Sequence, residues 1–306
     1  MTRPGPELTE RDKVIMRSLA DYRLLTTEQV QRLHFPSNQT ALRRLRRLEA
    51  AKLVHRHRTH VLSTYAVTLT AKGAELLLQA GATSSDGPGM SRRPVRLPGE
   101  FFLRHMVAVN DLRIALELAV RRHSGVDLLG VLTDAVRTSV GPTTQPQAVI
   151  SESVSFGTGD NDRLVHVPDL AFALRRGDRQ ALFLAEVDRG TEVVGDPKRG
   201  VGLFVRFYLQ ALLTEAFQSL GARLGGPAGF QGFRILVVTT TNARVEAIRA
   251  RWGTMPVEPE LAKRLIWLSS SEALRSGALL EHEWCSLDPR DSRKYVIVPP
   301  QAGGES

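Results

Sequence analysis

The sequence predicts an α+β protein with a small, basic, helical module followed by a larger domain in which helices pack on a mixed sheet. Residues 1–96 hold 17 Lys and Arg residues against 8 Asp and Glu, and residues 97–306 hold 24 of each, so the net charge of +9 lies in the first third of the chain. A stretch rich in Gly, Pro and Ser then interrupts the helical periodicity. The order after it, helix, several strands, helix, strand, helix, strand, is typical of a mixed sheet. The expected parts are domain 1–82, linker 83–98, domain 99–298 and disordered tail 299–306.

The composition favours a soluble protein of a reducing compartment. Cys285 is the single cysteine, which excludes an internal disulfide framework and a cysteine-rich zinc site. The N-terminal "MTRPGPELTERDK" has no apolar core of signal-peptide length, and no uninterrupted apolar run is long enough to cross a membrane. We therefore expect a cytoplasmic protein with no membrane partner.

The basic module opens with two helices that have clear start signals. Thr9 is a predicted N-cap, with Asp12 three residues later, and Val14, Ile15 and Leu19 follow at helical spacing. In "TTEQVQRLHF", one of the two threonines at 26 and 27 caps a second helix.

A third helix begins after a turn at Pro36–Ser37 and separates apolar from basic side chains. Leu42, Leu45 and Leu48 share one side of it. At about 100° per residue, a polar set falls on the other side. This set comprises Gln39, Thr40, Arg43, Arg46 and Arg47.

Two short strands and a final helix complete the module. The stretch "LVHRHRTHVLSTYAVTLT" predicts a hairpin with a basic tip, and "TAKGAELLLQAG" predicts a helix that ends at Gly81. Three helices, a hairpin and a basic third helix form the pattern of a winged helix-turn-helix, whose third helix enters the major groove while the wing contacts the backbone. This module resembles the winged-helix modules of many bacterial DNA-binding proteins.

Double-stranded DNA is therefore the expected partner of the first module. The predicted contacts are Gln39, Thr40, Arg43, Arg46 and Arg47 of the third helix with Arg56 and Arg58 of the wing. The alternative is that these arginines are only the solvated side of a surface helix. A homodimer on two half-sites is compatible with such a module.

The second domain carries no glycine-rich phosphate loop and no spacing that argues for a Ser/His/Asp triad. Its helices are expected in "EFFLRHMVAVNDLRIALELAVRRH", "KRGVGLFVRFYLQALLTEAFQSL", "NARVEAIRARW" and "SSEALRSGAL". Its strands are expected in "VDLLGVLTDAVR", "QAVISESVSF", "FRILVVTT", "RLIWLSS" and a hairpin at 167–188.

The hairpin at 167–188 places carboxylates at the ends of apolar strands. Alternation puts Glu186 and Asp188 on one side of the second strand, and antiparallel pairing brings Asp169 beside them. Three converging carboxylates form a hard-cation site suited to Mg²⁺ or Mn²⁺. Such a metal polarises a phosphodiester and lowers the pKa of attacking water.

This arrangement resembles the PD-(D/E)XK nuclease superfamily, with "PD" at 168–169 and "EVD" at 186–188. The resemblance implies a nuclease-like α/β domain in which Asp169, Glu186 and Asp188 hold the metal. The superfamily pattern has lysine where this chain has Asp188, and Lys198 in the next helix is the candidate for a migrated ammonium.

More specifically, the chain resembles the replication-relaxation family of bacterial plasmids and integrative elements. The matching residues are the N-terminal winged helix, "H…VND" at His105 and 109–111, "PD" at 168–169, and "EVDRGTE" at 186–192 followed by Lys198 and Tyr208. The resemblance implies a role in replication or relaxation of plasmid or mobile-element DNA. Replication or conjugation proteins are further expected partners.

Three interpretations of the acidic residues stay open: carboxylates held by backbone amides and arginines, a retained metal site, and a degenerate nuclease fold used for binding. The expected function is a DNA-binding protein of plasmid or mobile-element replication or relaxation. The alternatives are a Mg²⁺- or Mn²⁺-dependent nickase or endonuclease with Asp169, Glu186, Asp188 and Lys198 as its catalytic residues, and a winged-helix transcription regulator.

Overall fold

The structure is a computed structural model of two compact units. It describes residues 8–81, 97, 99–133, 137–138, 147–148, 152–155, 163–190, 193–194, 196, 200–213, 217–225, 230–252, 258–274 and 279–298. The first unit comprises Met1–Ile114 and Arg137–Pro146, and the second comprises Ala115–Val136 and Gln147–Ser306. Helices and strands occur in both units, which confirms a mixed α+β protein.

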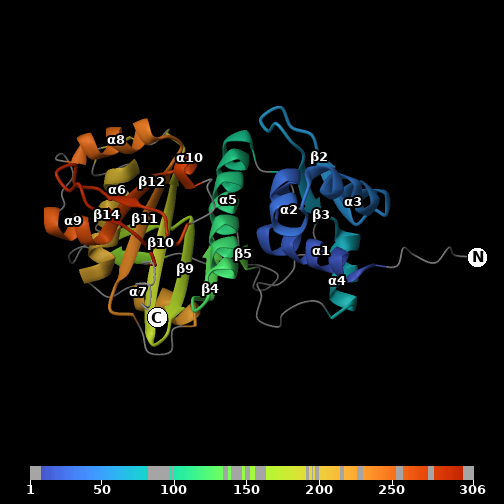
Figure 1. Cartoon of the computed structure of the whole chain (residues 1–306), viewed down its shortest axis with the longest axis horizontal. Coiled ribbons are helices and arrows are strands. Elements are labelled where there is room, and N and C mark those ends of the chain that lie inside the picture. The colour runs from blue at the N-terminus through green and yellow to red at the C-terminus, as the bar shows by residue number, and fades with distance from the viewer. Residues whose placement is uncertain are drawn as a thin grey trace, which may run out of the picture. The chain divides into compact units, whose positions relative to one another are not determined.

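The first unit contains four short helices and a small sheet (Figure 1). The helices are α1 (Glu10–Tyr22), α2 (Thr27–His34), α3 (Asn38–Ala50) and α4 (Ala71–Gln79). The strands are β1 (Leu25–Thr26), β2 (Val54–His57) and β3 (Ala66–Leu69), in the antiparallel order β1-β3-β2. The helices and the hairpin predicted for residues 10–79 are all present.

The helix starts of this unit follow from their capping residues. The Thr9 side chain accepts from the Asp12 amide and the Asp12 side chain accepts from the Thr9 amide, which forms the capping box of α1. Thr26 is the cap of α2, and Ser37 is the cap of α3. Val14, which the sequence places with the apolar residues of α1, is 45% exposed because it lies about 200° around the helix from the buried Met16.

Helix α5 (Glu100–Arg122) contains the division between the two units, which falls after Ile114. Its first half packs into the first unit, where Leu103 joins Leu24 and Ala66 in a small apolar cluster. Composition alone predicts a domain start at residue 99, and the compact N-terminal unit of the structure extends to Ile114. The predicted linker 83–98 lies outside the described residues except for Leu97.

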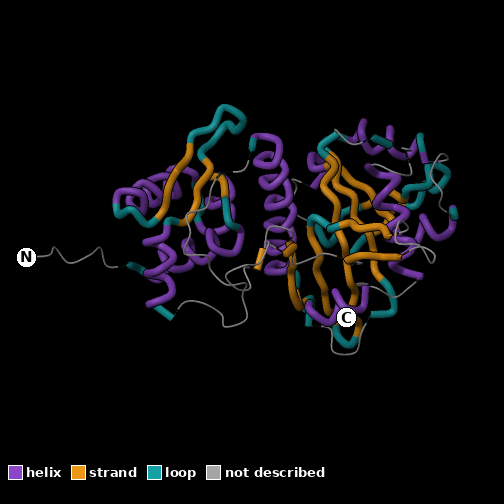
Figure 2. The backbone as a smooth tube through the Cα atoms, turned by 180° about the vertical axis from the view of Figure 1, so that it is seen from behind, coloured by secondary structure: helices purple, strands orange, loops and turns teal. Residues whose placement is uncertain are grey.

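The second unit is built on a seven-stranded mixed sheet (Figure 2). Its strands are β4 (Asp127–Thr133), β9 (Leu170–Arg176), β10 (Arg179–Asp188), β11 (Phe233–Thr239), β12 (Ile266–Ser270), β13 (Trp284–Ser286) and β14 (Lys294–Tyr295), in the order β14-β13-β12-β11-β10-β9-β4. Strands β10, β11 and β12 run parallel, and the other pairs are antiparallel. A further antiparallel pair of this unit is β7–β8 (Glu152–Ser155, Arg163–His166), and β6 (Gln147–Ala148) also belongs to it, whereas β5 (Arg137–Thr138) belongs to the first unit.

One face of this sheet carries the main apolar core. The helices of the unit are α6 (Gly200–Leu213), α7 (Phe217–Arg223), α8 (Asn242–Ala250), α9 (Pro259–Leu265) and α10 (Ser271–Leu274). Leu184 of β10 and Ile235 of β11 join Val205 of α6, Leu220 of α7 and Ile248 of α8 in this core. The acidic positions of β10 therefore continue a row of side chains that faces α6 and α8.

Five elements were not expected from the sequence: β1, β8, α9, β13 and β14. The predicted tail 299–306 lies outside the described residues. None of the helices in the described part of the chain combines the length and the apolar composition that a membrane crossing needs.

Candidate functional site

The outward side of α3 presents arginines to solvent. Arg43, Arg46 and Arg47 are exposed, whereas Leu45 and Leu48 are buried, as the helical periodicity predicts. Gln39 is exposed near the helix start, and Thr40 is half-buried. The sequence-predicted residues of α3 are thus brought together on one side of one helix.

The remaining arginine of α3 has a structural role. Arg44 forms an ion pair with Asp12 of α1, whose side chain is 2% exposed, and donates to the Thr9 hydroxyl at 2.9 Å. Burial acts to raise the pKa of the Asp12 carboxyl, but the hydrogen bonds from Arg44 and Thr9 outweigh it and lower that pKa. Among the described residues, Arg44 is the one arginine of α3 paired with a carboxylate, so it fixes α3 against α1.

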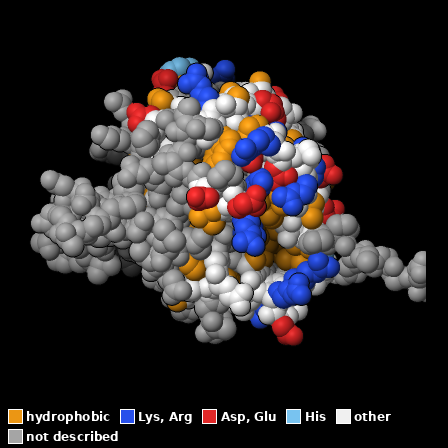
Figure 3. All heavy atoms as spheres, turned by 90° about the vertical axis from the view of Figure 1, so that its left-hand side faces the viewer, with side chains coloured by type: hydrophobic (Ala, Val, Ile, Leu, Met, Phe, Trp, Pro, Cys, Tyr) orange, Lys and Arg blue, Asp and Glu red, His pale blue; other side chains and the backbone are white. Residues whose placement is uncertain are grey.

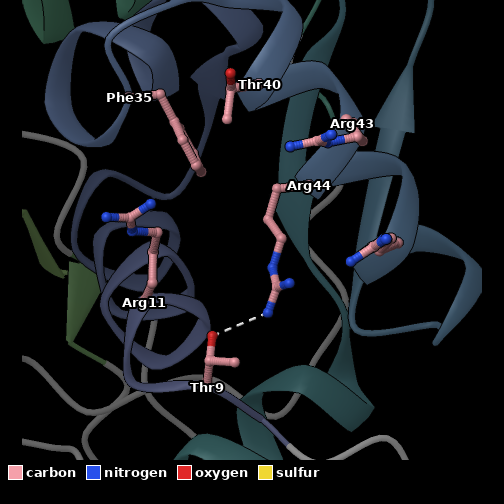
Figure 4. A pocket seen from close by; sticks show the side chains of 7 residues that line it. Thr9, Arg11, Phe35, Thr40, Arg43 and Arg44 are labelled. Atoms are coloured by element: carbon pink, nitrogen blue, oxygen red, sulfur yellow. Dashed lines mark hydrogen bonds between the residues drawn. The ribbon is translucent and has the colours of Figure 1, made fainter.

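A basic hollow of about 340 Å³ lies between the start of α1 and α3. In Figure 4, Thr40 and Arg43 come from α3, Arg11 comes from α1, and Arg44 extends across the hollow to Thr9. The Arg11 guanidinium lies 5.6 Å from the centroid of the Phe35 ring, and Arg47 completes the lining. Four arginines against the one carboxylate of Asp12 make this hollow attractive to an anion.

The two predicted wing residues, Arg56 and Arg58, differ in how freely their side chains could contact DNA. Arg56 Nε donates to Glu49 at 2.7 Å, and its guanidinium lies 4.8 Å from the Tyr65 ring centroid, so only 13% of this side chain is exposed. This geometry leaves Arg56 little freedom to contact DNA. Arg58 is exposed at the hairpin tip, where it lines a shallow surface hollow with His60 and Tyr65.

The acidic hairpin has the antiparallel pairing that the sequence predicts. Leu170 of β9 pairs with Ala185 of β10, so Asp169 lies beside the segment that carries the other two carboxylates. The Asp169 side chain accepts from the Val187 amide at 2.8 Å. Glu186 is 7% exposed and accepts from the hydroxyl of Tyr208 in α6. Burial, followed by the charge of Glu186 and this hydrogen bond, raises the pKa of Tyr208 well above its usual value.

Asp188 is tied to a different helix. Its side chain is 1% exposed, forms an ion pair with Arg244 Nε of α8 at 2.7 Å and accepts from the Gly190 amide at 2.7 Å. Gly190 has a φ of 82°, a conformation that favours glycine and lets the chain turn directly after the strand. The position where the nuclease pattern has lysine thus holds a carboxylate neutralised by an arginine from 56 residues later.

Each of the three carboxylates has a protein donor. A divalent metal would have to displace Tyr208 from Glu186 and Arg244 from Asp188 to reach their oxygens. In the part of the chain that the structure describes, no group of three or more His, Cys, Asp or Glu side chains is placed to hold a metal ion. Lys198 lies outside the described residues. The residues as arranged do not fit a metal centre, and the metal assignment stays a prediction.

Two residues of the "VND" stretch act within the first unit. The side-chain amide of Asn110, which is 3% exposed, donates to the Leu24 carbonyl at 2.6 Å, and Asp111 pairs with Arg32 of α2 at 2.6 Å. The residue type of Asn110 alone predicts no role for it. Its position on the apolar stripe of a helix was the available signal, since a buried amide needs a hydrogen-bond partner.

Comparison with known proteins gives one finding about family. The sequence model of a family described as replication-relaxation matches residues 16–208. No curated protein and no solved structure matches the chain. The matched range includes α2, α3, the "VND" residues, the acidic hairpin and Tyr208.

Proposed function

The chain belongs to the replication-relaxation family, and we propose that it is a DNA-binding protein acting in the replication or relaxation of plasmid or mobile-element DNA. In this proposal the first unit is a winged helix-turn-helix. Helix α3 enters the major groove and the β2–β3 hairpin lies along the backbone. The order of helices and strands in this unit, and its share of the positive charge, support the assignment.

The observation that carries the proposal is that the arginines of α3 differ in their contacts. Arg44 holds α3 against α1 through Asp12, while Arg43, Arg46 and Arg47 extend into solvent. Exposed guanidiniums on a rigidly held helix are pre-organised for bidentate contacts to phosphates and to guanine edges.

Duplex binding by full-length variants tests the proposal. We expect Arg43→Ala/Arg47→Ala to weaken binding of a labelled duplex at least about tenfold, because two charge-assisted contacts are lost. The matched control is Arg17→Ala/Lys72→Ala, which removes the same charge from exposed positions of α1 and α4. Fluorescence anisotropy at one fixed ionic strength measures both. Equal affinity of the two double variants would remove α3 from the interface.

For the second unit we propose a nuclease-like fold that serves as a scaffold for binding and positioning. The parallel β10–β11–β12 core next to the β9–β10 hairpin, with α6 on one face, supports a PD-(D/E)XK-like arrangement. The Glu186–Tyr208 and Asp188–Arg244 pairs support a structural role for the acidic positions.

The alternative function is metal-dependent nicking, favoured by the position of Asp169 next to the strand segment of Glu186 and Asp188. Supercoiled plasmid is incubated with the wild type, Asp169→Asn and Glu186→Gln in Mn²⁺ or Mg²⁺. The scaffold proposal predicts no nicking, or equal nicking by all three preparations. Nicking by the wild type that both variants lose would contradict it.

A further inference from the structure

The loop between β13 and β14 contains two consecutive Asp-x-Arg turns, "DPR" and "DSR", at residues 288–293. In the first turn, the Asp288 carboxylate accepts from Arg290 Nε at 3.1 Å and from its terminal nitrogen at 3.2 Å, and also from the Arg290 amide at 2.9 Å. In the second, Asp291 accepts from Arg293 Nε at 2.9 Å, from its terminal nitrogen at 3.2 Å and from its amide at 3.1 Å. The two turns repeat the same geometry three residues apart.

Both turns are held in place by buried aspartate side chains and by hydrogen bonds from Arg249. The Asp288 and Asp291 side chains are 0% and 4% exposed. Arg249 of α8 donates one terminal nitrogen to the Asp288 carbonyl at 3.3 Å and to the Asp291 carbonyl at 3.2 Å, which holds the two turns together. Hydrogen bonds from Arg293, acting against burial, lower the pKa of Asp291 strongly, so this carboxylate stays ionised.

The two guanidiniums are nevertheless open to solvent. The side chains of Arg290 and Arg293 are 70% and 68% exposed. A guanidinium has five N–H donors, and each carboxylate engages Nε and one terminal nitrogen, so a second donor edge remains free of the aspartate. The ion pairs fix the direction of these edges, which lowers the entropy lost when a ligand binds.

Further charged side chains lie on α9 and β14. Lys294 follows Arg293 directly and is exposed, Arg264 of α9 is exposed, and Lys263 lies 3.7 Å from Asp288 and pairs with Glu260 at 2.7 Å. Figure 3 views the side of the molecule on which α9 and β14 lie in Figure 1, and it shows Lys and Arg side chains gathered over this surface with acidic side chains between them. The pKa of Arg234 is lowered, first by burial and second by the positive charge of Arg264. This like-charge crowding would be relieved by a bound anion.

We propose that this surface, made by Arg290 and Arg293 with Arg264 and Lys294, binds the phosphate backbone of nucleic acid as a contact separate from α3. Two oriented forks three residues apart suit successive phosphates better than they suit isolated carboxylates, because a guanidinium edge matches a phosphate bidentately. The inference rests on the proposed function only in taking DNA as the partner. It gives the C-terminal part of the chain a role that the family match over residues 16–208 does not reach.

The salt dependence of duplex binding by the full-length protein tests this surface. We expect Arg290→Gln/Arg293→Gln to flatten the slope of log affinity against log salt by about 1.8, the value for two phosphate contacts. Its affinity deficit relative to the wild type then shrinks about tenfold when salt rises fourfold. The matched control, Arg179→Gln/Arg223→Gln, removes two exposed arginines of the same unit from β10 and α7 and should keep the wild-type slope.

A second variant protects the test against misfolding. Lys294→Glu leaves both aspartate–arginine pairs intact and reverses a charge on the same surface, so it should weaken binding and flatten the slope in the same direction. Circular dichroism shows whether Arg290→Gln/Arg293→Gln remains folded. If that variant unfolds, the Lys294→Glu slope alone decides.

The outcomes separate this surface from the α3 proposal. A wild-type slope for Arg290→Gln/Arg293→Gln or, if that unfolds, for Lys294→Glu, beside a flattened slope for Arg43→Ala/Arg47→Ala, would overturn this inference alone. The reverse pattern would support it and remove α3. Poly-L-glutamate that displaces the duplex as well as unlabelled DNA does, from the wild type but not from the arginine variant, would overturn it in favour of an acidic protein partner.

Discussion

Removing Arg244 tests whether the acidic position at the end of β10 is structural. In Arg244→Met the aliphatic part of the side chain is kept and the charge is lost, so Asp188, 1% exposed, remains as a buried carboxylate. Breaking a buried ion pair by removing one partner costs about 3–5 kcal/mol. The Gly190 amide still donates at 2.7 Å and Arg244 itself is 19% exposed, so we take the low end, about 3 kcal/mol.

Thermal and urea unfolding of the full-length protein measure this loss. For a unit of this size, about 3 kcal/mol corresponds to a fall in Tm of about 6–12 °C. Asp188→Asn should cost only about 1 kcal/mol, because it leaves a partly exposed guanidinium that water can solvate. The double variant should resemble Asp188→Asn. A loss below about 1 kcal/mol for Arg244→Met, or a larger loss for Asp188→Asn, would refute the ion-pair account.

Three further perturbations address other contacts. Tyr208→Phe should destabilise the second unit by about 1–3 kcal/mol in urea titrations, because Glu186 loses a buried donor; an unchanged midpoint would mean that water or another group replaces the hydroxyl. Asn110→Ala should cost a similar amount and should speed proteolysis of the first half of α5, since the Leu24 carbonyl loses its partner; equal digestion of variant and wild type would contradict this. Burial and the charge of His55 lower the pKa of His57 below its unfolded value, so its contribution is present above about pH 6.5 and is lost as the pH falls below that value. His57→Gln should therefore lose less stability than the wild type between about pH 7.5 and about pH 5, and parallel losses would argue against this role.

The helices α1 to α4 of the first unit could be predicted from local signals alone. Thr9, Thr26 and Ser37 set the helix starts through hydrogen bonds that span three residues, and such signals are legible in sequence. The periodicity of α3 likewise identified the exposed arginines. It could not show that Arg44 differs from its neighbours, because the partner, Asp12, lies 32 residues away.

In the second unit, contacts between residues far apart in the sequence could not be predicted. The β9–β10 hairpin followed from alternation and a short turn, so the proximity of Asp169 to Glu186 could be foreseen. The donors that satisfy the acidic positions could not, since Tyr208 and Arg244 reach them from helices 22 and 56 residues away. Short strands such as β14, of two residues, carry no periodic signal, and they owe their structure to pairing with neighbours.

Whether α3 docks on DNA can be tested directly, because the chain has a single cysteine. A Cys285→Ser protein with Gln39→Cys carries an iron–EDTA probe at the exposed start of α3, and the same protein with Lys72→Cys carries it on α4. Each is mixed with labelled duplex, and strand cleavage is quantified after addition of ascorbate and peroxide. We expect strong cleavage from position 39 and background cleavage from position 72. Equal cleavage from both positions, or cleavage from position 72 alone, would contradict DNA docking through α3.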